Sequence, residues 1–153
     1  MLTEIFYSCE KKPEYFSFIS DYFKVEFTEK SFNDRTLTVH AIHDGIDIVA
    51  VALVRKKKEC YRINFIHVAE KYQRQRFGKF LLNLVHSYAF KQNKGPVNII
   101  TRVKANNLTS LNFFTTLGYK FKTYESKSET VQVNGNIITT IKPAYILTYD
   151  HTE

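Results

Sequence analysis

The 153-residue chain contains no tryptophan, a single methionine, two cysteines, three prolines and five glycines. Two cysteines, Cys9 and Cys60, are too few for a disulfide framework, so we expect a reducing intracellular setting, the cytoplasm. Neither cysteine has a metal ligand close by in the sequence, which predicts that there is no structural metal site. Because so little glycine and proline leaves no flexible linker, we expect a single domain over residues 1–153.

Long apolar runs are missing as well. No stretch approaches the roughly 18 residues that a membrane-spanning helix needs, and the first residues, MLTEIFYSCEKK, lack the basic-then-apolar order of a signal peptide. The sequence therefore predicts no membrane partner. Phenylalanine (13) and tyrosine (10) are abundant instead, and with 44% hydrophobic residues the chain can build one core.

Positive charge is in excess, because the chain has a net charge of +7. Such an excess favours an anionic ligand or partner of some kind. The lysines and arginines are scattered along the sequence and no nucleic-acid-binding module is recognisable, so a nucleic-acid partner is the weakest hypothesis that the charge supports.

Hydrophobic periodicity divides the chain into strands and helices. The predicted order is a helix (13–23), strands (36–43, 46–54 and 61–68), a helix (77–94), a strand (97–103), a helix (107–117) and a strand-like tail from 119 to 150 with a hairpin turn at 134–135. The strand–helix–strand segment from 61 to 103 implies a parallel pair with a right-handed crossover. The fold class is therefore α/β, or α+β by a stricter definition, with a mixed, mostly antiparallel sheet flanked by helices.

One short segment, residues 72–82 (YQRQRFGKFLL), places several basic and amide side chains at the start of the longest helix. A helix N-terminus presents unpaired N–H groups and the positive end of the helix dipole, and anions bind there. The segment is therefore compatible with a pyrophosphate-binding loop, although a plain basic helix cap with a glycine at a bend would read the same way. It contains neither the P-loop pattern GxxxxGK[ST] nor the dinucleotide pattern GxGxxG.

The strand, the loop and the helix together resemble the acyl-CoA-binding motif of the GNAT N-acetyltransferase superfamily, which reads Gln/Arg-x-x-Gly-x-Gly/Ala. Gln73 and Gly78 match its first and last positions, while Arg76 stands where the middle glycine is expected. A second stretch, NLTSLNFFTTLGY at 107–119, resembles the family's Asn-x-x-Ala-x-x-Leu-Tyr-x-x-Leu-Gly-Phe helix. The positions in register there are Asn107, Ser110, Phe113, Leu117, Gly118 and Tyr119. The resemblance is clearest over residues 60–120 and nearest to the ribosomal-protein alanine acetyltransferase type.

This resemblance implies a GNAT-like domain whose sheet contains a splayed parallel strand pair, with acetyl-CoA or CoA as the cofactor. It implies an acetyl-CoA-dependent N-acetyltransferase that moves an acetyl group by direct attack of a primary amine, belonging to a protein N-terminus, a lysine or a small molecule. Many members dimerise through terminal strands, so a homodimer is open here too. The cofactor-binding residues carried over from the family are Ile66, His67, Val68, Gln73, Arg74, Gln75, Arg76, Phe77, Gly78, Lys79, Asn107, Ser110 and Phe114.

Two family positions depart from the pattern. Relatives of the alanine acetyltransferase type carry a glutamate base and a tyrosine acid where this chain has Arg102 and Phe114, and neither side chain can do that proton transfer. The remaining catalytic candidates are His67 on the cofactor strand and the tyrosines Tyr119, Tyr124 and Tyr145, of which His67 and Tyr119 are preferred. For His67 the competing interpretation is a packed histidine, because strand alternation places it opposite its two neighbours unless a bulge changes the face. A catalytically weak or inactive GNAT-fold domain that binds CoA or a partner is the alternative function.

Overall fold

The computed structural model describes residues 4–23 and 27–152, except for the side chains of residues 127 and 129, and the chain forms two compact units. The first unit spans residues 1–99 and 150–153, and the second unit spans residues 100–149. Among the described residues no helix combines the length and the apolar character needed to cross a membrane, and no three acidic, histidine or cysteine side chains gather as a metal ion would require.

The first unit is built on a sheet. Helix α3 (Phe77–Asn93) leads from the end of one strand to the start of its neighbour, and such a crossover makes the two strands, β4 and β5, parallel. The other neighbouring strands pair antiparallel. The mixed, mostly antiparallel sheet predicted from the sequence is thereby confirmed, whereas the splaying of the parallel pair stays a prediction. The strands lie side by side in the order β1 (Phe6–Ser8), β2 (Leu37–His43), β3 (Ile48–Lys56), β4 (Tyr61–Val68) and the beginning of β5 (Val97–Lys104).

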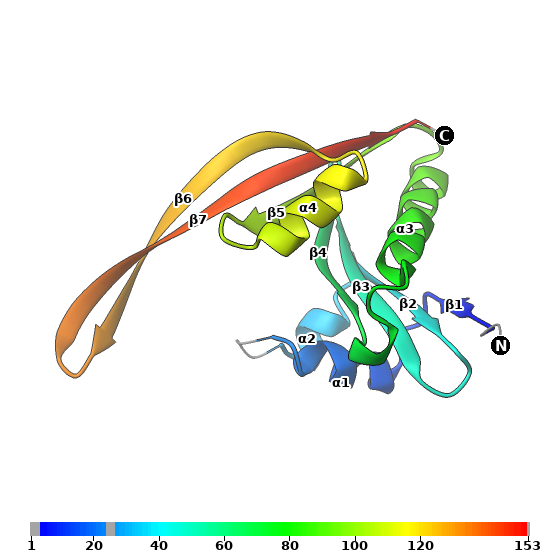
Figure 1. Cartoon of the computed structure of the whole chain (residues 1–153), viewed down its shortest axis with the longest axis horizontal. Helices are drawn as coiled ribbons and strands as arrows, with labels where there is room; N and C mark the ends of the chain where they lie inside the picture. The colour runs from blue at the N-terminus through cyan, green and yellow to red at the C-terminus, as the bar shows by residue number, and fades with distance from the viewer. Residues whose placement is uncertain (1–3, 24–26, 153) are drawn as a thin grey trace. The chain divides into compact units, whose positions relative to one another are not determined.

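Helices cover both faces of this sheet (Figure 1). On one face lie α1 (Pro13–Ser20) and α2 (Glu29–Phe32), whose buried aromatic and aliphatic side chains form one core cluster with residues of β2 and β3. Helix α3 covers the other face, where Tyr88 packs edge-on against His40 of β2 at 4.6 Å. The predicted helix at 77–94 is confirmed to within a residue, because the backbone turns left-handed at Lys94 (φ 57°) and ends the helix there.

A β-bulge in β4 decides which of its side chains face which helix. The register with β3 shifts at this point, and Asn64 is the extra residue of the bulge. Before the bulge, Ile63 faces the α3 side of the sheet. After it, Phe65 and His67 lie opposite residues of β3 that belong to the core cluster beneath α1. The bulge therefore brings His67 to the face that α1 and α2 cover.

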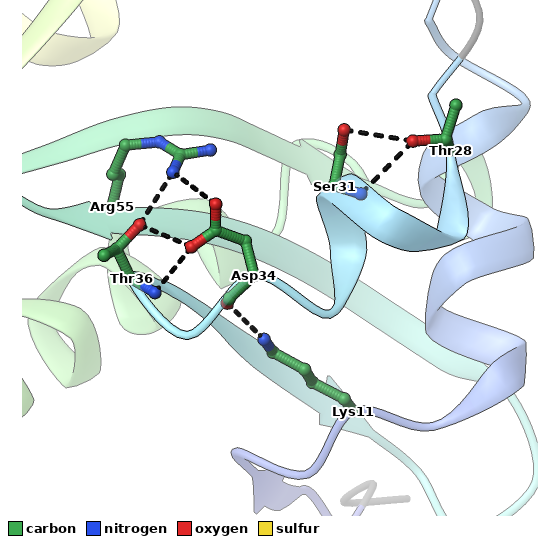
Figure 2. A network of polar contacts seen from close by, with 6 residues as sticks. All are labelled: Lys11, Thr28, Ser31, Asp34, Thr36 and Arg55. Carbon is green, nitrogen blue, oxygen red and sulfur yellow. Dashed lines mark hydrogen bonds and ion pairs between the residues drawn. The ribbon is translucent and has the colours of Figure 1, made fainter.

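The turn between α2 and β2 is fixed by a polar network around Asp34 (Figure 2). The Asp34 carboxylate accepts hydrogen bonds from the N–H of Thr36 at 2.8 Å and from its hydroxyl at 2.7 Å, and it pairs with Arg55 at 3.5 Å. The hydrogen bonds from Thr36, above all, hold the pKa of Asp34 below its ordinary value. Lys11 Nζ donates to the Asp34 carbonyl oxygen at 2.8 Å, so one residue ties the start of α1 to β2 and β3.

The second unit contains the rest of β5, helix α4 (Leu108–Thr116) and a long hairpin of β6 (Lys120–Val133) and β7 (Asn136–His151), drawn from yellow to red in Figure 1. Strand β7 lies between β5 and β6, so β6 is an edge strand. The turn residues Asn134 and Gly135 both have left-handed backbone, with φ of 51° and 79°, as a tight two-residue hairpin requires. The hairpin turn predicted from the sequence is confirmed.

The structure differs from the predicted elements in the end of the first helix and in three short elements that the sequence did not predict. Helix α1 ends at Ser20, three residues earlier than predicted, because Tyr22 and Phe23 instead pack their rings on side chains of β4. The elements β1, α2 and the 3-10 turn η1 (Glu70–Tyr72) were not predicted. Each has only three or four residues, which is too short for a periodic pattern.

Candidate active site

The segment between β4 and α3 is anchored by a buried tyrosine. Tyr72 is 7% exposed, its ring packs edge-on against Phe77 at 5.5 Å, and its hydroxyl donates a hydrogen bond to the carboxylate of Asp44. That carboxylate also accepts N–H bonds from Ile46 and Asp47, and the Tyr72 bond together with these lowers the pKa of Asp44 to about 2. The turn after β2 thus fixes the position of the loop between β4 and α3. Sequence reasoning missed this contact, because Asp44 reads as a turn residue and lies 28 positions from its partner.

The last residues of β4 are braced by glutamines of the loop. Ile66 and Val68 are half-buried on the α3 face. Gln73 Nε2 donates to the Val68 carbonyl oxygen at 3.0 Å, and Gln75 Nε2 donates to the Lys71 carbonyl oxygen at 3.3 Å. Both glutamine side chains are therefore engaged with the backbone of their own segment, and they set the course of the loop towards α3.

Two arginines turn the chain into α3 with left-handed backbone. Arg74 has φ of 64°, and Arg76, the residue before the helix, has φ of 68°. Gly78 is the second residue of the helix and is not left-handed. The conformation that favours glycine therefore occurs at Arg76, which occupies the position of the motif's middle glycine. The left-handed position that favours glycine is thus occupied by an arginine, whereas Gly78 has helical backbone.

The start of α3 offers unpaired N–H groups. The first hydrogen bond of the helix runs from Phe80 N–H to the Arg76 carbonyl oxygen at 3.1 Å. The N–H groups of Phe77, Gly78 and Lys79 precede it, so the helix provides them with no acceptor. No acidic residue lies in the first turn, and the side chains of Lys79 and of both loop arginines are exposed. The amides and the positive end of the helix dipole thus lie in a segment that carries three exposed cationic residues, a combination that suits a pyrophosphate.

His67 lies on the opposite face of β4 from the residues that precede and follow it, as strand alternation predicts. Its ring is half-buried among aromatic rings, with centroid separations of 3.7 Å to Tyr22, 5.9 Å to Phe18 and 6.2 Å to Phe65. Burial lowers the pKa of His67 below its ordinary value of 6.5. The imidazole is therefore neutral at pH 7 and able to accept a proton.

Four of the predicted site residues lie in the second unit. Asn107 caps α4, since its Oδ1 accepts a hydrogen bond from the N–H of Ser110 at 3.1 Å. Phe114 is 4% exposed and Tyr119 is 3% exposed, and their rings pack edge-on with centroids 5.1 Å apart. Burial raises the pKa of Tyr119. The burial of Tyr119 against Phe114 is compatible with a packing role for this tyrosine.

Arg102, the other departure from the family pattern, is held by an ion pair in the second unit. Its Nε donates to Glu125 Oε2 at 3.1 Å. Glu125 of β6 lies opposite the fully buried Ala144 of β7, whose small side chain lets the pair reach across that strand. No spacing in the sequence signals this contact, because the partners are 23 residues apart on strands separated by a third.

An open hollow of about 700 Å³ lies on the second unit. It carries no charged lining residue and so offers no partner to a pyrophosphate. None of the predicted site residues lines it. The lining residues are Leu108, Thr109, Leu111, Asn112, Thr115 and Phe121.

The strand, loop and helix just described lie within a recognised family domain. A model of the Acetyltransferase (GNAT) family matches residues 2–119, well over half of the chain. The chain belongs to the GNAT acetyltransferase family. The resemblance carried by the two sequence motifs is therefore confirmed, and the matched range includes the whole of β4, the loop and α3. No curated protein sequence matches the chain.

Solved structures of GNAT proteins share this fold. The ribosomal-protein-S18-alanine N-acetyltransferase of Escherichia coli has a TM-score of 0.73 at 15% identity, covering 98% of this chain and 96% of its own. NAA60 of Arabidopsis thaliana in complex with acetyl-CoA has a TM-score of 0.72 at 14% identity, covering 96% and 98%. The IAA acetyltransferase of Bacillus cereus has a TM-score of 0.71 at 14% identity, covering 97% and 100%. At such identities the likeness establishes the fold.

Membership of the GNAT family makes acetyl-CoA the acetyl donor of the reaction. Similar structures contain it, among them NAA60 and a GNAT acetyltransferase from Elizabethkingia anophelis. The predicted cofactor is thereby confirmed, and the general reaction is transfer of an acetyl group to an amine acceptor. The start of α3, with its unpaired amides, is compatible with the diphosphate of this donor.

Proposed function

We propose that the chain is an active N-acetyltransferase that transfers the acetyl group of acetyl-CoA to a primary amine, of a protein N-terminus, a lysine or a small molecule, by direct attack. The observation that carries the proposal is the start of α3, where free amides follow β4 in a segment that also carries the exposed residues Arg74, Arg76 and Lys79. These groups bind the diphosphate, and the end of β4 receives the thioester arm. Asn107, Ser110 and Phe114, in the second unit, stay cofactor-binding predictions that rest on the family motif.

His67 acts as the general base in this proposal. The donor supplies an activated acetyl group, and the amine nitrogen forms a bond to its carbonyl carbon while the bond from that carbon to sulfur breaks. His67 takes a proton from the attacking nitrogen, and the departing thiolate is protonated by solvent. The imidazole is neutral at pH 7 because burial lowers its pKa. A positioned base of this kind contributes roughly 100- to 10,000-fold to the rate.

Calorimetry with acetyl-CoA tests the binding site. Wild type is expected to bind, and Gly78→Trp is expected to abolish binding, because an indole at the second residue of α3 fills the space in front of the free amides. Gln92→Trp, exposed near the other end of the same helix, is the matched control and should bind like wild type. A wild type that does not bind, or a Gly78→Trp variant that binds normally, would show that the loop is not the cofactor site.

Replacement of the base tests the mechanism separately. His67→Gln should lower the acetyl-transfer rate about 100-fold or more while leaving the affinity for acetyl-CoA unchanged. In wild type the acid limb of the rate profile should lie below pH 6.5, because burial lowers the pKa of His67. An unchanged rate in His67→Gln would assign the proton transfer to solvent or to another group.

A non-catalytic domain that binds CoA or a partner is the second candidate. It is favoured by the two departures from the family pattern, since Arg102 is paired with Glu125 and Phe114 is buried in the packing of the second unit. Both residues therefore have structural roles at positions that relatives use for catalysis. Release of CoA that depends on an added amine would rule this candidate out, whereas binding of acetyl-CoA without any turnover would support it.

We further propose that two copies associate through the β6–β7 hairpin. A two-stranded ribbon is marginally stable by itself, and β6 is an edge strand. Antiparallel pairing of two such edges joins their free backbone groups and brings the apolar side chains of the two β6 strands beside one another. The exposed apolar residues on the hairpin are Val131, Val133, Ile137, Ile138 and Ile141.

A further inference from the structure

The surroundings of His67 are made of aromatic rings. The ring centroids of Tyr22 and His67 are 3.7 Å apart, and those of Phe18 and Tyr22 are 5.4 Å apart. Phe65 lies two residues before His67 on β4, with its ring centroid 6.2 Å away. The rings continue from Phe65 to Phe23, at 5.4 Å and nearly parallel. This aromatic surface is a product of two features: the bulge in β4, which turns Phe65 and His67 to the α1 face, and the early end of α1, which frees Tyr22 and Phe23 to pack there.

The aromatic surface is open to solvent at one end and closed at the other. Tyr22 is 47% exposed, whereas Phe18, Phe23 and Phe65 are half-buried and packed on the core cluster. The pKa of His67 is lowered by burial, with no charged neighbour among the causes. The neighbours of the His67 ring are therefore apolar ring faces, of which that of Tyr22 is the most exposed.

Such a surface discriminates between amines. The group that carries the reacting nitrogen is desolvated against these rings, which stabilises an aromatic or aliphatic group, and the rings themselves supply no carboxylate to pair with a second ammonium. Among the described residues, the carboxylate directly before Tyr22 in the sequence is that of Asp21, which caps α1 and is exposed. The substitution Asp21→Asn separates the contribution of this carboxylate to amine binding from that of the rings.

We propose that Phe18, Tyr22 and Phe65 form the acceptor-binding surface beside His67, and that the preferred acceptor is a primary amine carried on an aromatic or large apolar group. The inference rests on the proposed acetyl transfer, in which His67 faces the attacking nitrogen. A small arylalkylamine and a peptide with an N-terminal phenylalanine share this chemistry. Polyamines, which carry further positive charge in place of an apolar group, are poor acceptors.

The test measures amine binding as well as turnover. Calorimetry with 2-phenylethylamine, a tetrapeptide beginning with phenylalanine, and spermidine, each titrated into the protein saturated with CoA, reports acceptor affinity without any reaction. Wild type should bind at least one of the two aromatic amines about tenfold more tightly than spermidine, and which of them binds better identifies the source of the acceptor. Tyr22→Ala should weaken aromatic binding about tenfold or more and leave the affinity for CoA unchanged.

Two control variants separate the causes. Phe6→Ala removes another exposed ring stacked on a histidine, His43 at 5.4 Å, and should have no effect. Asp21→Asn should also have no effect on the aromatic amines. Preference for spermidine, loss of binding in Asp21→Asn, or unchanged aromatic binding in Tyr22→Ala would each overturn the inference. Failure of the proposed transferase is recognised differently, by absence of acetyl-CoA binding or by absence of turnover while the aromatic amine still binds.

Discussion

At the scale of single residues, the entry into α3 depends on backbone conformation more than on side-chain identity. Arg74 and Arg76 both have left-handed φ values, which cost an L-residue with a side chain about 1–2 kcal/mol relative to the right-handed region. The chain keeps arginine at both places. The exposed guanidinium groups then lie beside the free amides of α3, which is consistent with a functional reason for the strain.

This view predicts the effect of Arg76→Gly. The substitution removes the left-handed strain, and this gain offsets the greater flexibility of glycine in the unfolded chain. The free energy of unfolding in urea should be unchanged or raised by up to about 1 kcal/mol. Gln75→Gly, one residue earlier at an ordinary φ, should instead lower it by about 0.5–1 kcal/mol. An equal loss in both variants would contradict the assignment of strain to Arg76.

At the scale of elements, β2 carries a buried histidine in a directed chain of hydrogen bonds. The Thr38 hydroxyl donates to the Val54 carbonyl oxygen at 3.3 Å and therefore accepts from His40 Nε2 at 3.0 Å. His40 Nδ1 then accepts from the hydroxyl of Tyr7 at 2.6 Å, and the Cys9 thiol donates to that hydroxyl at 2.8 Å. These hydrogen bonds join β1 to β2 and β3 around the neutral imidazole of His40.

The buried histidine predicts acid sensitivity. Burial lowers the pKa of His40 from 6.5 to about 4, so between these values the unfolded chain binds a proton that the folded chain does not. The contribution of the neutral His40 imidazole to the free energy of unfolding is therefore present in full above pH 6.5. It falls by on the order of 3 kcal/mol as the pH falls towards 4. His86, with its pKa lowered to about 4 by burial and by His151, contributes over the same range.

Urea denaturation at several pH values between 4 and 7.5 measures this loss. In His40→Gln the decline of unfolding free energy with acidity should be shallower than in wild type, whatever the change in absolute stability. His43→Gln, at the half-exposed end of the same strand, should keep the wild-type slope. A wild-type slope in His40→Gln would assign the acid sensitivity to other groups.

At the scale of the whole molecule, the β6–β7 hairpin predicts association. Val131 and Val133 are each 44% exposed, and both point to the same side of the edge strand β6 because they are two residues apart. The double substitution Val131→Lys with Val133→Lys should convert a dimer to a monomer in light scattering, because it places charge on the proposed interface. Ile46→Lys, on a 93% exposed turn residue of the first unit, is the control and should stay dimeric. A monomeric wild type at micromolar concentration would refute the association.

Much of this protein follows from local sequence. Periodicity predicted the sheet strands, the parallel connection and the start of α3 at Phe77, because strands and long helices repeat with fixed periods. The hairpin turn at Asn134-Gly135 was likewise predicted from its own two residues. The family followed from two motifs in order, and with it the donor.

The face of the sheet on which His67 lies, and the side chains that surround it there, were decided only by the tertiary structure. Sequence spacing could not locate the bulge at Asn64 or bring Tyr22 onto His67, because both depend on contacts between segments far apart in the chain. The same holds for Tyr72 with Asp44 and for the pair of Arg102. Local periodicity fixes which elements form, whereas side-chain partners across strands are chosen by packing, which the sequence encodes only through the whole fold.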